Sequence, residues 1–378
     1  MNEPRILLDA TAVPADRGGV GRYVDALLPA LAGLGADLVV VCQPRDVPVI
    51  SGLVPGVPVV TGPPALSSRA ARLGWEQTGL PALVRRVGAD VLHSPHYTTA
   101  AVGRFARTVT LHDATFFSHP QLHSAVKGRF FRAAIRAAVR SRASLVVPSN
   151  ATALEVARYT GAQPDRFHVA HHGVDTEFFH PVDDAERRRV HALLGLAPDE
   201  RYVGFLGTLE PRKNVPALIR AWVRAVEHRP DPPALVLAGG PGWDPMVGPA
   251  VDAVPAGLHL VRTGYLPLAD LAGFLAGATV LAYPSLGEGF GLPVLEAMAC
   301  GAAVLTTREL SLPEVGGDAV AYTGTAEDQI SAALGELLAD ERRRGELAAA
   351  GERRAAGFTW RAAAQVHLEA YRAAVDAR

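Results

Sequence analysis

The sequence predicts an α/β protein of two domains, each built on a doubly wound parallel sheet. Short runs of β-branched residues alternate with longer, amphipathic, Ala-rich stretches. Strands that alternate with helices of about 10–15 residues form βαβ units and a parallel sheet. The units occur in two series that a polar, charge-rich stretch separates. At roughly 150 residues per domain, a length of 378 residues also favours two or three domains.

Each series contains enough predicted strands for its own sheet. The strands of the first series are 5–9, 37–42, 57–61, 91–93, 108–112 and 145–148. Those of the second series are 202–206, 234–238, 258–263, 280–283 and 303–306. Helical patterns lie between them, for example at 23–34 and 215–227. The number of strands in each half therefore favours two sheets of similar size.

The stretch 171–189 is interpreted as the connection between the domains, because it is polar, contains glycine and proline and carries a run of charges. The boundary is expected within 175–197 and placed at 180/181, so that the domains are 1–180 and 181–357. Residues 358–378 show apolar residues at helical spacing and are predicted to pack back toward the N-terminal domain. Ligands of such sheets bind outside the carboxyl ends of the strands. With two facing domains, the cleft between them is the expected site.

The composition excludes several classes of protein. Hydrophobic residues make up 49% and charged residues 20%, which excludes a disordered chain. The 37 Lys and Arg are balanced by 38 Asp and Glu, so no global positive field is present to hold nucleic acid. Cys42 and Cys300 are too few for a disulfide framework or a Cys-rich zinc site. We recognise no signal peptide and no stretch near the roughly 20 apolar residues of a transmembrane helix, so a cytoplasmic protein is expected.

The most informative stretch is YPSLGEGFGLPVLEAMACG, residues 283–301. It predicts the end of a strand, a glycine-containing loop and then a helix. Gly289 and Gly291 let backbone amides approach a ligand closely, and the start of the helix favours an anion such as a diphosphate. Glu288 and Glu296 carry carboxylates that accept hydrogen bonds from sugar hydroxyls. Taken singly, each glutamate is explained equally well as a solvated residue.

A second motif, GTLEPRKN, follows the predicted strand 202–206. Its Arg212 and Lys213 are adjacent cations in a loop that opens the next helix. A departing nucleoside diphosphate gains negative charge, which fixed cations stabilise. Alone, such a pair on a loop is usually just solvated. The sequence contains no Asp-x-Asp, the motif with which metal-dependent nucleotide-sugar enzymes commonly hold a divalent ion, so metal-free stabilisation of the leaving group is favoured.

The N-terminal half carries a glycine-rich segment, DRGGVGRY, at 16–23. Gly18, Gly19 and Gly21 are predicted to form a flexible turn before a helix and to approach a phosphate. As a dinucleotide fingerprint the segment fails, because Val24 stands where a third glycine is needed and no acidic residue closes the next strand. An NADP enzyme is an alternative that has only Arg45 in its favour.

Polar residues follow two further strands of this half. Strand 108–112 delivers His112 and Asp113 to a loop at its carboxyl end, and a lone histidine in such a place is more often structural than catalytic. The string LHSPHYTT also ends a strand, and it places His93, His96 and Tyr97 at the carboxyl end of that strand.

Together these motifs resemble the retaining GT-B glycosyltransferases of family 4, from Ile6 to about Tyr371. The Glu-x7-Glu spacing and the Arg/Lys segment are the most specific features. The resemblance implies the GT-B fold, two facing Rossmann-like domains with an interdomain cleft. It implies that Glu296 holds the ribose hydroxyls and that Glu288 meets hydroxyls of the transferred hexose. One departure is Thr208, where many members have an arginine, so Arg212 is expected to take that role alone.

The resemblance also assigns the other candidate residues. It places His112, Arg212, Lys213 and Glu288 in the catalytic centre. It assigns donor binding to Gly19, Gly21, Gly207, Gly289, Phe290, Gly291, Leu292 and Glu296. It puts His93, His96, Tyr97 and Asp113 on the acceptor side. The string WEQTGLP, at 75–81, indicates a mannosyltransferase-like member.

The implied activity is transfer of a hexose, with mannose from GDP-mannose as the expected donor, to a glycan, lipid-linked or small-molecule acceptor. The resemblance implies retention by front-face substitution through an oxocarbenium-like transition state, with no metal and no cofactor beyond the nucleotide-sugar co-substrate. The alternatives are a UDP-sugar-dependent glucosyltransferase, an epimerase, a phosphorylase, a glycosidase and a non-enzymatic sugar-nucleotide binder. A phosphorylase needs a lysine for pyridoxal phosphate, and neither Lys127 nor Lys213 stands in a suitable signature. A glycosidase gives the glycines and the Arg-Lys pair no role.

The stretch VKGRFFRAAIRAAVRSR, at 126–142, predicts a basic amphipathic helix. Such helices bind anionic lipid surfaces, so peripheral contact with the inner face of the cell membrane is one interpretation. In the other, Phe131, Ile135 and Val139 pack on the sheet and the arginines are solvated. Exposure of Phe130 distinguishes the two, because only an uncovered apolar face can enter a membrane.

Overall fold

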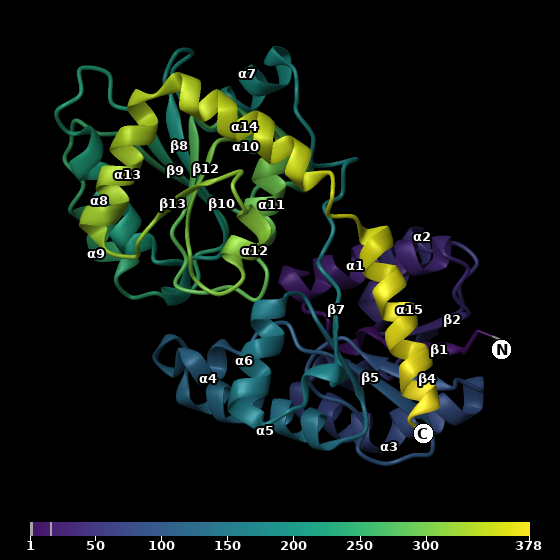
Figure 1. The fold of residues 1–378 in the computed structure, drawn as a ribbon. Helices are drawn as coiled ribbons and strands as arrows, with labels where there is room; N and C mark the ends of the chain where they lie inside the picture. The colour runs from purple at the N-terminus through teal and green to yellow at the C-terminus, as the bar shows by residue number, and fades with distance from the viewer. Residues whose placement is uncertain (1–2, 16) are drawn as a thin grey trace. The chain divides into compact units, whose positions relative to one another are not determined.

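The structure is a computed structural model, and it describes residues 3–15 and 17–378 (Figure 1). The chain forms two compact units, which are treated separately below. Unit 1 comprises Met1–Gly173 and Thr359–Arg378, and unit 2 comprises Val174–Phe358. The first division thus falls at 173/174, seven residues before the expected 180/181. The second falls at 358/359, and the terminal helix that follows it belongs to unit 1.

The described part of unit 1 contains a seven-stranded parallel sheet with the order β3-β2-β1-β4-β5-β6-β7. Its strands are β1 Ile6–Asp9, β2 Leu38–Cys42, β3 Val59–Thr61, β4 Val91–Ser94, β5 Ala106–Thr110, β6 Ser144–Val147 and β7 Phe167–Val169. Its helices are α1 Gly18–Gly33, α2 Val47–Leu53, α3 Arg69–Val87, α4 Thr115–Ser118, α5 Ala125–Arg140, α6 Asn150–Thr160 and α15 Trp360–Asp376. The strand order reverses between β1 and β4, which is where doubly wound sheets bind ligands.

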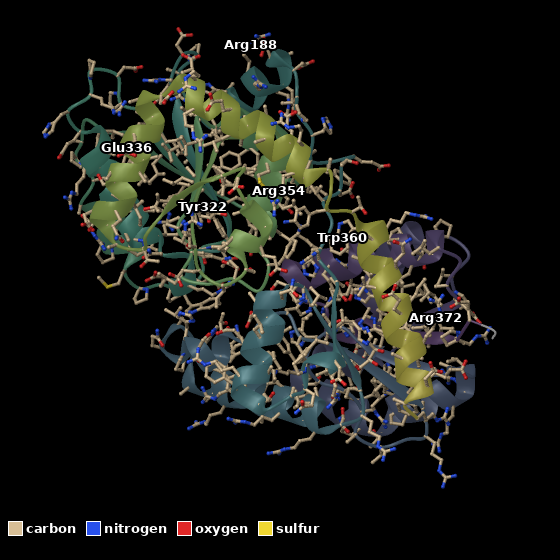
Figure 2. The ribbon with its side chains drawn as sticks, in the orientation of Figure 1. Arg188, Tyr322, Glu336, Arg354, Trp360 and Arg372 are labelled. Atoms are coloured by element: carbon tan, nitrogen blue, oxygen red, sulfur yellow. The ribbon has the colours of Figure 1, made fainter. Side chains whose placement is uncertain are left out.

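Both faces of this sheet are covered by helices, so its strands are apolar on both sides. On one face, Ile6 and Leu8 pack with residues of α1 and α15. On the other, Leu7 packs with α3, and β5 and β6 pack with α5. Figure 2 labels Trp360 and Arg372 on α15. Gly173 lies against the backbone of Trp360, where a Cβ atom would come within 2.1 Å of the Trp360 nitrogen, so this close approach requires glycine.

The described part of unit 2 contains a six-stranded parallel sheet with the order β10-β9-β8-β11-β12-β13. Its strands are β8 Tyr202–Leu206, β9 Ala234–Ala238, β10 Leu260–Gly264, β11 Val280–Tyr283, β12 Val304–Thr307 and β13 Ala321–Thr323. Its helices are α7 Asp184–Leu193, α8 Val215–Val226, α9 Val247–Asp252, α10 Leu268–Gly277, α11 Leu292–Ala299, α12 Leu312–Gly316, α13 Glu327–Ala339 and α14 Glu341–Ala355. The order reverses between β8 and β11, which places the expected ligand site at their carboxyl ends.

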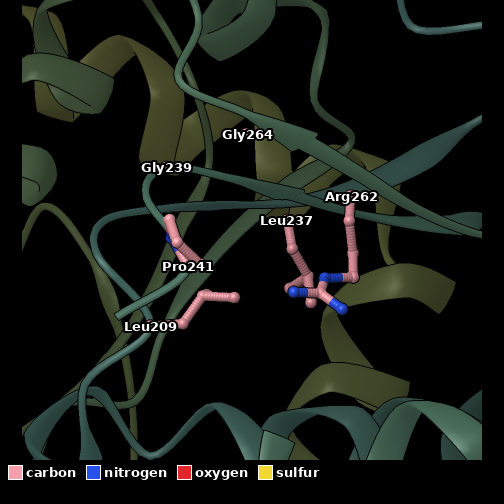
Figure 3. A pocket seen from close by; sticks show the side chains of 6 residues that line it. All are labelled: Leu209, Leu237, Gly239, Pro241, Arg262 and Gly264. Carbon is pink, nitrogen blue, oxygen red and sulfur yellow. The ribbon is translucent and has the colours of Figure 1, made fainter. Parts of the chain in front are cut away.

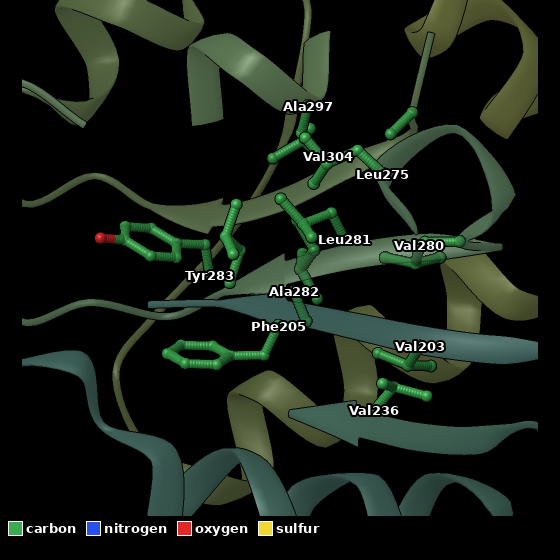
Figure 4. Close-up of a cluster of buried hydrophobic side chains, with 14 of the residues drawn as sticks. Val203, Phe205, Val236, Leu275, Val280, Leu281, Ala282, Tyr283, Ala297 and Val304 are labelled. Carbon is green, nitrogen blue, oxygen red and sulfur yellow. The ribbon is translucent and has the colours of Figure 1, made fainter. Parts of the chain in front are cut away.

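The central strands of unit 2 are fully buried. Figure 4 shows Val203 and Phe205 of β8 beside residues of β9 and β11. The Phe205 ring stacks on Tyr283, with 5.9 Å between the centroids. Helices α8, α9 and α13 form one group, and α10, α11 and α14 form another, with the sheet between them in Figure 1. This core anchors the strand ends from which the loops of the site project.

Several local predictions differ from the structure. The stretch 171–189 is not entirely a connection, because Asp183 caps α7 and Val190 of that helix is buried in unit 2. The strands β7 and β13 were not predicted, since each is a three-residue, partly exposed edge strand with little pattern. Helix α1 begins at Gly18, so the three glycines form its first turn and not a turn before it. Asp16, the first residue of that predicted segment, lies outside the described residues.

Candidate active site

Two loops meet at the carboxyl ends of β8 and β11 in unit 2. The first, after β8, contains a short 3-10 helix, Pro211–Lys213, and the second runs from β11 to α11. The backbone oxygen of Arg212 accepts a hydrogen bond from Leu286 N at 2.8 Å, and Ser285 Oγ lies 3.1 Å from the same oxygen. Asn214 has a φ of +59° and ends the 3-10 helix, so α8 begins directly after the two cations. These bonds fix Arg212 and Lys213 beside the second loop.

The carboxylate of Glu288 lies between the two cations. Its Oε1 accepts a hydrogen bond from Lys213 Nζ at 2.7 Å, and its Oε2 is paired with Arg212 Nη1. Arg212 also donates to the backbone oxygen of Gly287 at 2.8 Å and to Glu210 Oε1 at 2.7 Å. Two cations and two carboxylates therefore form one ion cluster, in which Lys213 and Glu288 are buried.

Two hydroxyl groups complete the environment of Glu288. Ser285 Oγ donates to Glu288 Oε1 at 2.6 Å, and Tyr283 OH donates to the same oxygen at 2.9 Å. Lys213 Nζ also donates to Tyr283 OH. A buried carboxylate is stable only when its oxygens are satisfied, and here Oε1 alone accepts three hydrogen bonds.

The electrostatics of the cluster follow from burial and from the neighbouring charges. Burial alone would raise the pKa of Glu288, but the charges of Arg212 and Lys213 outweigh it and lower that pKa to about 2. Burial and the charge of Arg212 lower the pKa of Lys213, and Glu288 opposes this shift. Burial and the charge of Glu288 raise the pKa of Tyr283 well above its usual value. Glu288 is therefore a carboxylate at neutral pH.

The helix after the second loop carries the second glutamate. Gly291 has a φ of +108° and immediately precedes α11, a conformation that favours glycine. Glu296 lies within α11 with only 2% of its surface exposed, so it is not a solvated residue. Phe290 is buried and packs edge to face on Phe358, whereas Leu292, the first residue of α11, is half-buried. The glycine loop is thus held between a rigid helix and the core.

A cavity of about 240 Å³ opens on the same edge of unit 2, at the ends of β8, β9 and β10. Its lining residues are Leu209, Leu237, Gly239, Pro241, Arg262 and Gly264 (Figure 3). Figure 3 shows the guanidinium of Arg262 beside Leu237. The apolar side chains can pack on the face of a flat ring, and the planar guanidinium can donate hydrogen bonds to acceptors on the edge of that ring. Gly207, at the end of β8, adopts a φ of +152°.

In unit 1, His112 follows β5 and is half-buried among aromatic rings. Its Nε2 lies 2.7 Å from the backbone oxygen of Pro95, which can only accept, so Nε2 carries the proton. In the neutral ring Nδ1 then carries the lone pair and can accept a hydrogen bond from a hydroxyl. Tyr97 and Tyr23 pack edge to face on this ring, with centroids at 5.8 and 5.0 Å. Burial lowers the pKa of His112, which favours this neutral form.

Residues of the loop after β4 are held by helix α3. Glu76 Oε2 accepts a hydrogen bond from Thr98 Oγ1 at 2.6 Å, and Gln77 Nε2 donates to the Thr99 oxygen at 3.1 Å. Tyr97 has a φ of +56° and its hydroxyl accepts a hydrogen bond from Asp113 N at 3.1 Å. Glu76 and Gln77, which belong to the WEQTGLP string, therefore hold the loop that supports His112.

The remaining acceptor candidates lie in different surroundings. Asp113 Oδ1 accepts hydrogen bonds from the nitrogen and hydroxyl of Thr115, at 3.1 and 2.9 Å. His96 is half-buried, with its ring edge to face on Tyr97 and Phe131. Burial lowers the pKa of His96 to about 3.

His93 differs from the expectation that it lines the acceptor side. It is fully buried, and its two ring nitrogens lie 2.9 Å from Thr110 Oγ1 and from Tyr371 OH. Neither nitrogen is left for an acceptor molecule.

In the first turn of α1, Gly19 is exposed, with open space where its Cβ would lie, and Gly21 is buried against Val13.

The basic helix predicted at 126–142 is α5, and its apolar face is covered. Phe131, Ile135 and Val139 are buried, and Phe130 is half-buried with the Arg69 guanidinium 4.5 Å from its ring centroid. Among the helices of the described chain, none has the length and apolar character needed to cross a bilayer.

Sequence reasoning missed one member of the ion cluster, Glu210, and the two hydroxyl residues that donate to Glu288, Tyr283 and Ser285. The Glu210 side chain is adjacent to the Arg-Lys pair, and Tyr283 ends a strand that points at the site. The positions of Glu210 and Tyr283 could have marked them as site residues, because acidic loop residues and residues at strand ends near a switch point are candidates for ligand binding. Ser285 gave no signal, because a serine in a Pro- and Gly-containing loop is ordinary turn chemistry.

Two families and several proteins of known class match this chain. The family described as Glycosyltransferase Family 4 matches residues 17–178, and the one described as Glycosyl transferases group 1 matches residues 200–340. O-antigen chain mannosyltransferase B of Escherichia coli is 31% identical over 286 residues, which cover 75% of this chain and 74% of that protein. D-inositol 3-phosphate glycosyltransferase of Kribbella flavida is 30% identical over 398 residues, covering 96% of this chain and 92% of that protein.

Solved structures agree on the fold. HepE of Anabaena, in complex with UDP and glucose, matches with a TM-score of 0.76 and 18% identity, covering 97% of this chain and 98% of that one. Sucrose-phosphate synthase of Thermosynechococcus elongatus matches with a TM-score of 0.77 and 22% identity, covering 98% of each chain. The two Rossmann-like units are therefore those of a GT-B glycosyltransferase. The chain belongs to glycosyltransferase family 4.

The ion cluster predicts a specific dependence of stability on Glu288. The Glu288→Gln variant leaves two cations without their shared carboxylate, and we expect it to lower the free energy of unfolding by about 3 kcal/mol at pH 7. Because the pKa of Glu288 is lowered on folding, its contribution is complete above the usual value of 4.5 and is lost as the pH falls toward about 2. Urea denaturation of both proteins at several pH values measures this difference.

The exposed Glu336 on α13 provides the control (Figure 2). Glu336→Gln removes the same charge from a solvated position and is expected to change the free energy of unfolding by less than about 0.5 kcal/mol. Equal effects of the two substitutions, or a Glu288 effect that does not shrink below pH 4.5, would contradict the geometry of the cluster.

Proposed function

We propose that this glycosyltransferase moves mannose from GDP-mannose to a hydroxyl group of a glycan, lipid-linked or small-molecule acceptor, with retention of configuration and without a metal ion. The observation that carries the proposal is the contact of Arg212 and Lys213 with Glu288 at the switch point of unit 2. Two cations held there by protein contacts suit a diphosphate, and the buried carboxylate suits sugar hydroxyls.

The cluster suggests how the donor binds. Arg212 and Lys213 are paired with Glu210 and Glu288, so an incoming diphosphate competes with these carboxylates for the same cations. Release of Glu288 from Arg212 frees an acceptor for hexose hydroxyls next to the phosphates. Glu296, buried in α11, is proposed to accept hydrogen bonds from the ribose hydroxyls.

The transfer step then uses these charges. The bond from the anomeric carbon to the phosphate oxygen breaks, and the electron pair leaves with the nucleoside diphosphate. The acceptor oxygen attacks the same face, and its proton passes to the departing phosphate oxygen. Arg212 and Lys213 stabilise the charge that develops on the leaving group. His112 is proposed to accept a hydrogen bond from a sugar hydroxyl at Nδ1, the atom left free by its bond to Pro95.

The cavity around Arg262 supports guanine as the proposed donor base. A guanidinium presents two parallel N–H groups, which match the O6 and N7 acceptors on one edge of guanine. The relative from Escherichia coli is a mannosyltransferase, which also favours mannose. HepE was solved with UDP and glucose, and a UDP-sugar donor is the competing assignment.

Thermal unfolding with free nucleotides tests the donor base. We expect GDP to raise the unfolding midpoint more than UDP or ADP, because a ligand that binds only the folded state stabilises it. Arg262→Gln should remove the preference for GDP, while Arg188→Gln, at an exposed position on α7, should preserve it (Figure 2). A larger shift with UDP would assign a UDP-sugar donor, and the absence of any shift would overturn the donor assignment.

Kinetics test the division of roles within the site. We expect Glu296→Ala to raise the donor KM about tenfold or more, since it removes charge-assisted hydrogen bonds worth roughly 1.5–3 kcal/mol. Lys213→Ala should instead lower kcat, because its contact strengthens as charge develops on the leaving group. Initial rates with varied donor concentration measure both.

Controls separate these effects from loss of folding. Lys127→Ala and Glu336→Ala should leave both constants within about twofold, and circular dichroism checks that each variant is folded. Wild-type activity should persist in EDTA, and the product should keep the anomeric configuration of the donor. Equal, small effects of the two site variants, or activity that chelation abolishes and Mg²⁺ restores, would contradict the proposed mechanism.

We propose that any attachment to a membrane is electrostatic, between the arginines of α5 and anionic lipids, because the apolar face of this helix is covered. Arg129, Arg136 and Arg140 are exposed on this helix. We expect sedimentation with anionic vesicles at low salt, none with zwitterionic vesicles, and loss in an Arg129→Glu/Arg140→Glu double variant. Failure to bind anionic vesicles at low salt would exclude this attachment.

A further inference from the structure

Five buried side chains of unit 1 form one continuous chain of hydrogen bonds. They come from four elements that are distant in the sequence: α1, β4, β5 and α15. In order along the chain they are Tyr371, His93, Thr110, Tyr23 and His367. The successive separations are 2.9 Å, 2.9 Å, 3.0 Å and 2.6 Å. Each of the five has at most 1% of its surface exposed.

The direction of every hydrogen bond follows from one fixed end. His367 Nδ1 lies 2.7 Å from the backbone oxygen of Ala363, which can only accept. Nδ1 of His367 therefore carries the proton, and in the neutral ring Nε2 must accept from Tyr23 OH. The Tyr23 oxygen then accepts from the hydroxyl of Thr110.

The same reasoning continues to the other end. The Thr110 oxygen, having given its proton to Tyr23, accepts from His93 Nε2, so this nitrogen is protonated. His93 Nδ1 then accepts from Tyr371 OH. Each of the four contacts thus has one donor and one acceptor, and both histidines are neutral. Burial lowers the pKa of His93 well below its usual value and that of His367 to about 4, which agrees with neutral rings.

The chain reaches His112 through Tyr23. The Tyr23 ring packs edge to face on His112, with 5.0 Å between the centroids and 84° between the planes. The hydroxyl of Tyr23 is held from two sides by Thr110 and His367, so its ring has a fixed orientation against His112. A buried polar network raises stability little compared with an apolar core, but a fully satisfied one specifies a single geometry.

We propose that Tyr23 and His367 are positioning residues for His112, and that the one-way hydrogen-bond chain holds the Tyr23 ring that orients the His112 imidazole. The proposal rests on the proposed function in one respect, the participation of His112 in transfer. Helix α15, which is separated from the rest of unit 1 by the whole of unit 2 in the sequence, thereby supplies the residue that fixes the orientation of Tyr23.

Three variants test the chain. Tyr23→Phe keeps the ring and removes the hydroxyl, and His367→Leu removes the acceptor for that hydroxyl. His367→Gln restores an acceptor and a donor and should rescue the second variant. Tyr371→Phe is the matched control, because it removes a buried hydroxyl from the far end and leaves the bonds around Tyr23 in place.

Nitrogen-15 spectra of selectively labelled histidine provide a readout that needs no activity. In the wild-type protein we expect His367 as the Nδ1–H tautomer and His93 and His112 as Nε2–H tautomers. The His112 signals should shift or broaden in Tyr23→Phe and His367→Leu, and should keep their positions in Tyr371→Phe. An Nε2–H tautomer at His367 would overturn the proposal, and so would His112 signals that keep their positions and widths in Tyr23→Phe.

A double-mutant cycle measures the consequence for catalysis. Tyr23→Phe should lower kcat about tenfold with the donor KM within about twofold, and Tyr371→Phe should leave kcat within about twofold. In a His112→Ala background, Tyr23→Phe should have no further effect. Additive effects would show that Tyr23 acts independently of His112. If the wild-type protein transfers no sugar from any nucleotide donor, the proposed function fails, and the spectra alone then decide the positioning role.

Discussion

The buried carboxylate of Glu288 imposes the main constraint on unit 2. A charge in such a place must be paired and hydrogen-bonded, and the partners come from two loops that are 75 residues apart in the sequence. The loops can meet only because β8 and β11 are neighbours in the sheet although two strands, β9 and β10, separate them in sequence order. The position of Arg212 and Lys213, the path of the glycine loop and the start of α11 all follow from this adjacency.

The same pairing explains how the cluster can respond to a ligand. In the structure Arg212 and Lys213 are matched by Glu210 and Glu288, so the formal charges of these four side chains cancel. A site that was cationic without a ligand would leave buried charge uncompensated, at a cost of several kcal/mol. Internal carboxylates remove that cost, and in the proposed mode of donor binding a diphosphate takes over as the source of negative charge. Positive charge is thus kept in place without destabilising the folded unit.

Much of unit 2 could be predicted from the sequence, because its strands are continuous apolar runs with sharp ends. The strands 202–206, 234–238 and 280–283 were predicted with the bounds that the structure shows. Glu288, Arg212 and Lys213 were each recognised as site candidates from their motifs. Their mutual contact was not predicted, since no local pattern reports which loops meet. Ser285 was missed for the same reason, since its role exists only through Glu288, whereas the position of Tyr283 at the end of a strand was a signal that was not used.

Unit 1 was predicted less completely, and His93 shows why. A histidine at the end of a strand has the same local sequence whether it faces a ligand or a helix, and here α15, more than 260 residues later in the chain, covers it. Local pattern also misplaced the start of α1, because glycines were taken as a turn although three of them fit the first turn of a helix. For His93 a distant packing partner decided between two interpretations that the sequence alone left equal.

The two units hold their buried polar side chains in different ways. Each places polar side chains where the strand order of a parallel sheet reverses, but unit 2 uses charged groups and unit 1 uses a neutral hydrogen-bond chain. The difference suits the ligands proposed for them. A diphosphate carries charge into its site and can exchange one ionic partner for another, so a preformed ion cluster serves it. A sugar or acceptor hydroxyl brings no charge, and a neutral imidazole whose tautomer and orientation are already fixed recognises it best. A charged histidine chain in unit 1 would need counter-ions that a buried core does not supply.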